Sequence, residues 1–266
     1  MNTELSHVEI DSLSVGYRQA GAGPPLVLLH GFLCDSRCWR RQLADLSREF
    51  TVIAWDAPGA GSSSDPPNSF ALTDWSRCLG RFLDKLGIER AHIAGLSWGG
   101  VLAQDFHRLS PTRVSSLILA DTYAGWKGSF PASIVEQRLV RCERDSDLPP
   151  TEFARRWVPE MFTDAAPPAL LEELSAVFAD FHPLGFRLMA KSLAETDTTT
   201  FLARIDSPTL LLWGEADARS PVAIGEQLRD AIPGAGLELI AHAGHVSNME
   251  QPAAFNTHVR RFCVAV

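Results

Sequence analysis

The chain has 266 residues, of which 45% are hydrophobic and 21% charged, as in an ordinary globular protein. Its formal net charge of −8 argues against nucleic acid or an anionic membrane surface as a partner. No run of eighteen apolar residues occurs, so we expect no transmembrane helix. An α/β chain of this length is commonly a single domain.

The first seven residues contain neither the basic nor the apolar region of a signal peptide, which favours a cytoplasmic location. The five cysteines are odd in number and follow no pattern, as expected for reduced thiols in a cytoplasm. Cys34 and Cys38 are spaced like metal ligands, but no second pair of Cys or His follows at ligand spacing. We therefore expect no metal site.

The first half of the chain alternates short apolar runs with helical patterns. Residues 7–20 alternate in polarity and predict an opening hairpin, which a Gly- and Pro-containing breaker cluster at 21–25 follows. Continuous apolar runs, of the kind that a parallel sheet buries on both faces, predict strands at 26–29, 51–55, 91–94 and 114–120. Helices are predicted from a cap at Asp35 or Ser36 to about Arg48, from a cap at Thr73 or Asp74 to Leu86, and over 101–109.

The pattern changes after Asp121. Residues 123–200 show helical patterns and no strand, and four helices are expected to begin near Pro131, Thr151, Pro167 and Leu184. Strands resume at 209–213 and 237–240, with helices near 222–232 and 252–262. The alternation of strand and helix predicts a mostly parallel sheet covered on both faces. We interpret 123–200 as a helical cap inserted into a core formed by residues 1–122 and 201–266.

One turn between a predicted strand and a predicted helix has the sequence Gly95-Leu96-Ser97-Trp98-Gly99-Gly100. A G-x-S-x-G sequence in this position is typical of a nucleophile elbow, a turn so tight that its flanking positions need glycine. The strained serine presents its hydroxyl at a helix N-terminus. Ser97 is therefore the predicted nucleophile, and the alternative is a tight turn with a spectator serine.

A serine hydroxyl is a poor nucleophile unless a base, itself held by a third group, takes its proton. Asp217 lies beyond the 209–213 strand and His245 in the loop after the last strand, where ligand sites of open α/β sheets gather. The order Ser97, Asp217, His245 is the nucleophile, acid and base order found with such elbows. Asp121, which also ends a strand, is the alternative acid, although we expect a structural role for it. His242 is the alternative base.

The developing oxyanion of a tetrahedral intermediate needs two donors. One is expected to be the backbone N–H of Trp98, directly after the nucleophile, and the other the N–H of Phe32, in the loop after the 26–29 strand. Gly31 permits a close backbone approach there. For His30 we expect a structural hydrogen-bonding role.

Five segments together resemble the α/β-hydrolase superfamily: His30-Gly31-Phe32, residues 56–62, the elbow, residues 214–217 and Gly244-His245. The resemblance implies an α/β fold with an eight-stranded, mostly parallel sheet and a helical cap. Because serine occupies the nucleophile position, it disfavours the epoxide hydrolases and haloalkane dehalogenases, which carry aspartate there. The elbow and residues 245–252 are similar to those of 3-oxoadipate enol-lactonases and small esterases. The His-Gly-Gly-Pro-Gly loop of proline iminopeptidases is absent.

These residues and the resemblance predict a hydrolase that uses no metal or organic cofactor. Its expected substrate is a small-molecule carboxylic ester or lactone with an apolar part; the alternatives are C–C bond hydrolysis, perhydrolase chemistry or a receptor without turnover. Residues 123–200 carry 8 Lys and Arg against 12 Asp and Glu, which counts against a strongly anionic substrate. An arginine cluster within this segment is either a carboxylate site or a solvated helix face (Arg138, Arg141, Arg155 and Arg156). Neither the oligomeric state nor the individual substrate is defined by the sequence.

Overall fold

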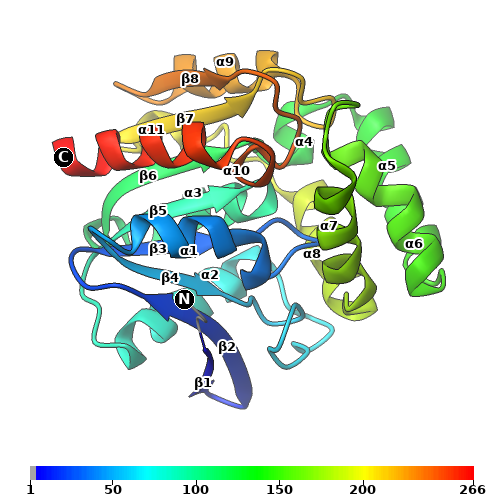
Figure 1. Cartoon of the computed structure of the whole chain (residues 1–266), viewed down its shortest axis with the longest axis horizontal. Coiled ribbons are helices and arrows are strands. Elements are labelled where there is room, and N and C mark those ends of the chain that lie inside the picture. The colour runs from blue at the N-terminus through cyan, green and yellow to red at the C-terminus, as the bar shows by residue number, and fades with distance from the viewer. Residues whose placement is uncertain (1–3) are drawn as a thin grey trace.

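The computed structural model describes residues 4–266, which form an eight-stranded sheet flanked by helices (Figure 1). The strands are β1 (Leu5–Ile10), β2 (Leu13–Ala20), β3 (Pro25–Leu29), β4 (Thr51–Trp55), β5 (Ala91–Leu96), β6 (Val114–Ala120), β7 (Thr209–Gly214) and β8 (Gly236–Ile240). Their order is β1-β2-β4-β3-β5-β6-β7-β8; the pairings of β1 with β2 and of β2 with β4 are antiparallel, and all others are parallel. The predicted α/β class with a mostly parallel eight-stranded sheet is confirmed.

Helices cover both faces of this sheet. They are α1 (Arg40–Leu46), α2 (Leu72–Lys85), α3 (Trp98–Leu109), α9 (Val222–Ala231), α10 (Ser247–Glu250) and α11 (Pro252–Ala265), with 3-10 turns η1 (Ser36–Trp39), η2 (Pro111–Arg113) and η4 (Leu202–Arg204). α1 and α11 pack together over one face, and α2 and α3 over the other (Figure 1). β5, at the centre of the sheet, is therefore buried along its whole length, and the elbow follows it directly.

The predicted helix starts are partly wrong. Asp35 caps η1 as expected, since its carboxylate accepts a 2.8 Å hydrogen bond from the N–H of Arg37. α2, however, begins at Leu72, so Asp74 lies inside its first turn and not at its cap. From there the Asp74 carboxylate accepts a 3.0 Å hydrogen bond from the N–H of Ala71. The helix therefore begins two residues before Asp74, whereas the sequence pattern placed Thr73 or Asp74 at its N-cap.

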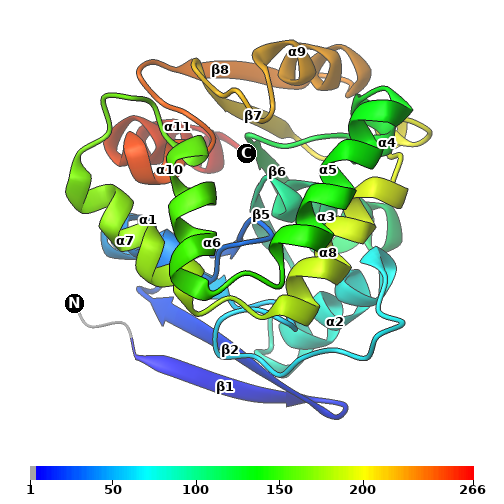
Figure 2. The ribbon, with the colours of Figure 1, turned by 90° about the vertical axis from the view of Figure 1, so that its right-hand side faces the viewer.

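Between β6 and β7 the chain forms helices and no strand, at the end of the sheet toward which the parallel strands run (Figure 2). These are α4 (Trp126–Ser129), α5 (Ala132–Asp145), α6 (Pro150–Trp157), η3 (Val158–Met161), α7 (Pro168–Ala179) and α8 (Pro183–Glu195). Four of them begin close to the predicted positions, whereas α4 was not predicted. Within residues 4–266, no helix has both the length and the apolar character that crossing a membrane requires.

All five cysteines are unpaired and buried. Among the described residues, His, Cys, Asp and Glu side chains do not gather in groups of three or more that would suit a metal ion.

Candidate active site

Ser97 lies in the turn between β5 and α3 with a backbone conformation that strains a non-glycine residue, at φ 53° and ψ −115°. Its N–H donates a 2.8 Å hydrogen bond to the carbonyl of Ala120, and its carbonyl accepts one of 2.5 Å from the Thr122 hydroxyl. A Cβ atom at Gly95 would lie 2.2 Å from the carbonyl oxygen of Gly99. The glycine is thus required by the close approach of the two sides of the turn.

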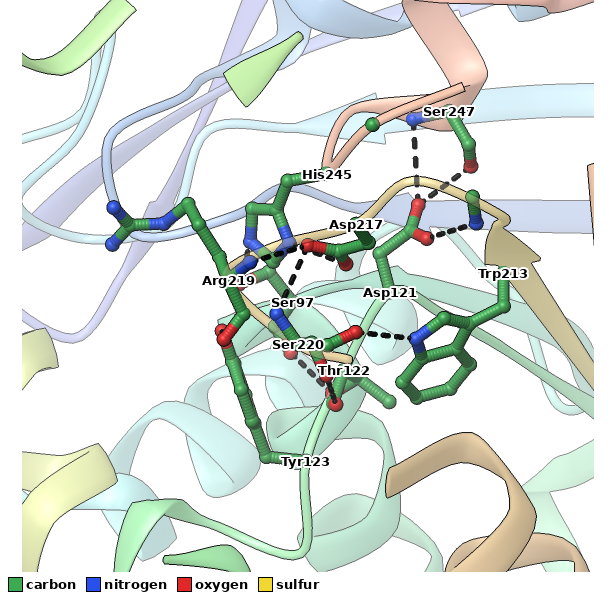
Figure 3. A network of polar contacts seen from close by, with 12 residues as sticks. Ser97, Asp121, Thr122, Tyr123, Trp213, Asp217, Arg219, Ser220, His245 and Ser247 are labelled. Carbon is green, nitrogen blue, oxygen red and sulfur yellow. Dashed lines mark hydrogen bonds and ion pairs between the residues drawn. The ribbon is translucent and has the colours of Figure 1, made fainter. Parts of the chain in front are cut away.

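Three side chains from distant parts of the chain form one line of hydrogen bonds (Figure 3). His245 Nε2 lies 3.0 Å from Ser97 Oγ, and His245 Nδ1 lies 2.8 Å from Asp217 Oδ2. All three residues are buried, with at most 5% of their surface exposed. A carboxylate can only accept hydrogen bonds, so the contact with Asp217 requires that the proton of a neutral imidazole lies on Nδ1. Nε2 then has no proton and accepts a hydrogen bond from the hydroxyl of Ser97.

The Asp217 carboxylate is held by its own loop. Its Oδ1 accepts hydrogen bonds from the N–H groups of Arg219, at 2.8 Å, and Ser220, at 2.9 Å. The loop is also joined to the one that leads to His245, because Ala216 N–H donates to the carbonyl of Ala243 at 2.9 Å. Asp217 and His245 are therefore positioned by adjoining loops after β7 and β8.

The other acid and base candidates of the sequence lie apart from this line. Asp121 is buried and accepts hydrogen bonds from Gly214 N–H, at 2.7 Å, and from the Ser247 hydroxyl, at 2.5 Å. Burial and, next, the nearby charge of Asp217 raise the pKa of Asp121 well above its ordinary value. His242 is exposed, and its carbonyl accepts from the Gln251 side chain. The structural role expected for Asp121 is confirmed, since its carboxylate joins the end of β7 to the residues that follow His245.

The loop after β3 brings backbone N–H groups beside Ser97. A Cβ atom at Gly31 would lie 3.5 Å from Ser97 Cβ, so this backbone is in contact with the nucleophile residue. Among residues 4–266, the N–H groups of Phe32 and Trp98 have no hydrogen-bond acceptor. The two N–H groups predicted as oxyanion donors are therefore without an acceptor, one in the residue after Ser97 and one in the residue after Gly31.

His30 stabilises the start of that loop through two hydrogen bonds. Its Nδ1 donates to the carbonyl of Gly31 at 2.7 Å, and its Nε2 accepts from the N–H of Ala57 at 3.0 Å. Burial lowers the pKa of His30, against the opposing effect of the Gly31 carbonyl and of Asp56, so the ring accepts and donates as a neutral imidazole. The expected structural role of His30 is confirmed.

The side chains of Phe32 and Trp98 contact the helices between β6 and β7. The Phe32 ring packs edge-on against Trp126 and Trp157 and stacks on Phe186. The indole N–H of Trp98 donates to the Ser192 hydroxyl at 2.9 Å. Next to these helices, His182 lies 2.6 Å from Asp65 through Nδ1 and 3.0 Å from the carbonyl of Gly61 through Nε2. These helices therefore contact Trp98, the residue directly after Ser97, and Phe32 in the loop after β3.

Only two of the four arginines of the predicted cluster line a cavity, although Arg141 and Arg156 both pair with Asp145 at 3.5 Å. Arg155 and Arg156 are exposed on α6, whereas Arg138 and Arg141 line a cavity together with Arg219, which the sequence did not single out. Tyr123 was also missed: its ring centroid lies 6.3 Å from that of His245, and its hydroxyl donates to the carbonyl of Arg219 at 3.1 Å. Neither residue stands in a recognisable motif.

An eight-stranded, mostly parallel sheet with a strained serine between a central strand and a helix defines the α/β-hydrolase class of fold. Residues 26–258 match the alpha/beta hydrolase family, and the chain belongs to this family. It is 31% identical to 3-oxoadipate enol-lactonase 2 of Acinetobacter baylyi over 233 residues, which are 88% of this chain and 86% of that protein.

The chain is also similar to solved structures along nearly its whole length. A hydrolase from Pseudomonas aeruginosa is 31% identical, with a TM-score of 0.88 and 99% of each chain covered. A thermophilic esterase from Thermogutta terrifontis is 28% identical, with a TM-score of 0.90 and 98% of each chain covered. The chain is thus an α/β-hydrolase enzyme, and its resemblance to esterases and lactonases is confirmed.

Proposed function

We propose that this protein is a serine hydrolase that cleaves a carboxylic ester or lactone through an acyl-enzyme. The observation that carries the proposal is the unbroken line of hydrogen bonds from Asp217 through His245 to Ser97, on a strained turn. The similarity to an enol-lactonase and an esterase supports the type of bond that is cleaved.

In the first half of the reaction, Ser97 Oγ attacks the carbonyl carbon while His245 Nε2 takes the hydroxyl proton. Asp217 keeps the imidazole in the required tautomer and stabilises the imidazolium. The N–H groups of Phe32 and Trp98 donate to the oxyanion. When the intermediate collapses, the ester C–O bond breaks and His245 gives its proton to the leaving oxygen.

In the second half, water attacks the acyl-enzyme carbonyl and His245 takes one of its protons. The second intermediate collapses to a carboxylic acid, and His245 returns the proton to Ser97 Oγ. With a lactone the leaving hydroxyl stays attached to the acyl chain, and the product is a hydroxy acid. These steps use only the three side chains, two backbone donors and water.

The substrate is proposed to bind beneath α4–α8, with residues 123–200 as a cap on a core of residues 1–122 and 201–266. Every proposed catalytic group lies outside 123–200, whereas the cap supplies aromatic side chains that touch Phe32. Phe186, which stacks on Phe32, also packs edge-on against Phe153 with ring centroids 5.4 Å apart. Such an aromatic lining fits a small-molecule substrate with an apolar part.

The test is covalent labelling by a fluorophosphonate together with turnover of a panel of esters and lactones. We expect Ser97→Ala to abolish labelling and to lower kcat/KM by roughly 10³-fold or more. Ser133→Ala is the matched control, because Ser133 is exposed on α5. Labelling of Ser97→Ala, or a single acyl transfer without further turnover by the wild type, would contradict the proposal.

A further inference from the structure

A cavity of about 220 Å³ lies where α4, α5, α6 and η3 meet the loop after Asp217. Three arginines line it, Arg138 and Arg141 from α5 and Arg219 from the loop, together with Trp126 and Trp157. Arg219 stands two residues after Asp217, but its side chain extends away from the line of hydrogen bonds (Figure 3). The cavity thus borders the loop of the proposed catalytic acid.

The positive charges around this cavity are only partly balanced. Arg141 and Arg219 both pair with Glu160, at 2.6 and 2.9 Å. Arg138 has no carboxylate within 4.0 Å in the described part of the chain; its Nη2 donates to the carbonyl of Arg219 at 2.8 Å, and its guanidinium lies 4.1 Å over the Phe130 ring. Arg141 also pairs with Asp145, at 3.5 Å, so Arg138 is the lining guanidinium that no carboxylate in the described part of the chain balances.

Three buried donors on the lining side chains have no acceptor among residues 4–266: Arg138 Nη1, Arg219 Nε and the indole Nε1 of Trp126. Trp126 is 99% buried, since only 1% of its surface is exposed. Burial lowers the pKa of Arg219, against the effect of Tyr123 and Glu160. Buried donors that lack an acceptor are costly, and a ligand with acceptor oxygens would supply one to each.

We propose that this cavity binds the carboxylate group of a small molecule. A carboxylate has two oxygens that together accept up to four hydrogen bonds, enough for the three donors. Its single negative charge matches Arg138, the guanidinium that lacks a carboxylate, whereas a dianion would face repulsion from Glu160 in the same wall. At about 30 Å³ per water, the cavity has the volume of about seven waters, which is room for a carboxylate and a short carbon chain.

Two kinds of molecule can carry this carboxylate: the substrate itself, or a separate small acid. The two experiments below distinguish them. The substrate source rests on the proposed function. It is supported by Trp126 and Trp157, which line the cavity and also pack against Phe32 with ring centroids 6.1 Å apart, so the wall of the cavity is in contact with the residue of the proposed oxyanion donor. An ester or lactone with one carboxylate at the end of a short acyl chain is the substrate that fits; it keeps the expected apolar part and carries a single charge, whereas the net charge of residues 123–200 counts against a strongly anionic substrate.

The first experiment compares kcat/KM for mono-p-nitrophenyl glutarate and p-nitrophenyl valerate, two esters of equal chain length of which only the first ends in a carboxylate. We expect the wild type to prefer the glutarate ester, and Arg138→Met to lower that preference about tenfold or more. Trp126→Phe removes the indole N–H but keeps an aromatic ring, and is expected to lower the preference several-fold. Arg155→Met, a change of an exposed arginine on α6, is the control that should keep it.

The second experiment measures the binding of free glutarate to full-length Ser97→Ala by titration calorimetry, with and without Arg138→Met or Trp126→Phe. Binding that both changes weaken, without any preference between the esters, assigns the cavity to a separate acid and still supports a carboxylate site. The proposal is overturned if the esters are cleaved equally well by all variants and glutarate does not bind. If neither ester is cleaved but glutarate binds as expected, the proposed function fails and the carboxylate site stands.

Discussion

Asp121 accepts a 2.7 Å hydrogen bond from the N–H of Gly214, the residue that ends β7 three positions before Asp217. Its other oxygen accepts from the hydroxyl of Ser247, two residues beyond His245. One carboxylate at the end of β6 therefore holds both the loop that leads to Asp217 and the segment that follows His245. Two aspartates that follow neighbouring strands thus have different tasks: one contacts the imidazole, and the other ties the loops together.

This division predicts opposite outcomes for two similar substitutions. In Asp217→Asn the amide no longer selects the tautomer of His245, and kcat should fall by up to ~10⁴-fold. In Asp121→Asn the amide oxygen can still accept from Gly214 and the amide nitrogen can donate to Ser247, so we expect a loss below about tenfold. The measurement is kcat of both variants on one ester, with circular dichroism to confirm folding. A folded Asp121→Asn that is crippled while Asp217→Asn is active would reverse the assignment of the acid.

The raised pKa of Asp121 predicts how stability depends on pH. Burial and the charge of Asp217 make the folded protein retain a proton that the unfolded chain releases above its pKa of about 3.9. The free energy of unfolding of the wild type therefore falls, as far as this group is concerned, when the pH rises from about 4 toward the folded-state pKa. Asp121→Asn has no such proton. Its stability relative to the wild type should increase between about pH 4.5 and about pH 7.5 in urea titrations, and a constant difference would contradict the raised pKa of this carboxyl.

The strands were predictable because the signal for each lies within its own residues. Apolar runs such as 26–29 and 51–55 are buried on both faces in the structure, as a central parallel strand requires. The short helix α4 has no such signal, since its four residues, Trp126 to Ser129, include a glycine and are too few to show a period. The residue before α4 is Gly125, and glycine is required there by a contact with a residue far away in the sequence. A Cβ atom at Gly125 would lie 2.0 Å from the carbonyl oxygen of Thr196.

In the site, too, some residues could be predicted from their neighbours in the sequence and others could not. Ser97, Asp217 and His245 could be chosen because each follows a predicted strand, and the structure brings them into one hydrogen-bonded line. His182 could not be interpreted, because its partner Asp65 lies 117 residues away. The arginines of the cavity also depend on a contact between distant segments. Their spacing in the sequence places Arg138 and Arg141 on one face of a helix, but it does not predict that Arg219 lies beside them.

The hydrogen bond between α3 and α8 predicts a stability effect. The indole N–H of Trp98 is fully buried and donates to the hydroxyl of Ser192, which is also buried. Ser192→Ala leaves this donor without its acceptor, and the free energy of unfolding should fall by about 1–3 kcal/mol. The measurement is the urea midpoint and slope, with the exposed Ser133→Ala as a control expected to stay within about 0.5 kcal/mol of the wild type. Equal stability of the two variants would show that the indole finds another acceptor.

The proposed oxyanion donor on Phe32 can be tested by removing its N–H alone. Phe32 occupies the second position of a turn that the N–H of Cys34 closes by donating to the carbonyl of Gly31 at 2.9 Å, and proline is favoured at that position. Phe32→Pro also removes the ring that packs on Trp126, Trp157 and Phe186, so the matched control is Phe32→Ala, which loses the ring but keeps the N–H.

Both variants should change KM, because both alter the wall of the site. Only Phe32→Pro loses a donor to the developing oxyanion, and its kcat should lie about 10²–10³-fold below that of Phe32→Ala. The measurement is kcat on an activated ester such as p-nitrophenyl acetate, with circular dichroism to confirm that both variants fold. If their kcat values agree within a few-fold, the second oxyanion donor is not Phe32, and the N–H of Trp98 acts with a partner elsewhere in the loop after β3.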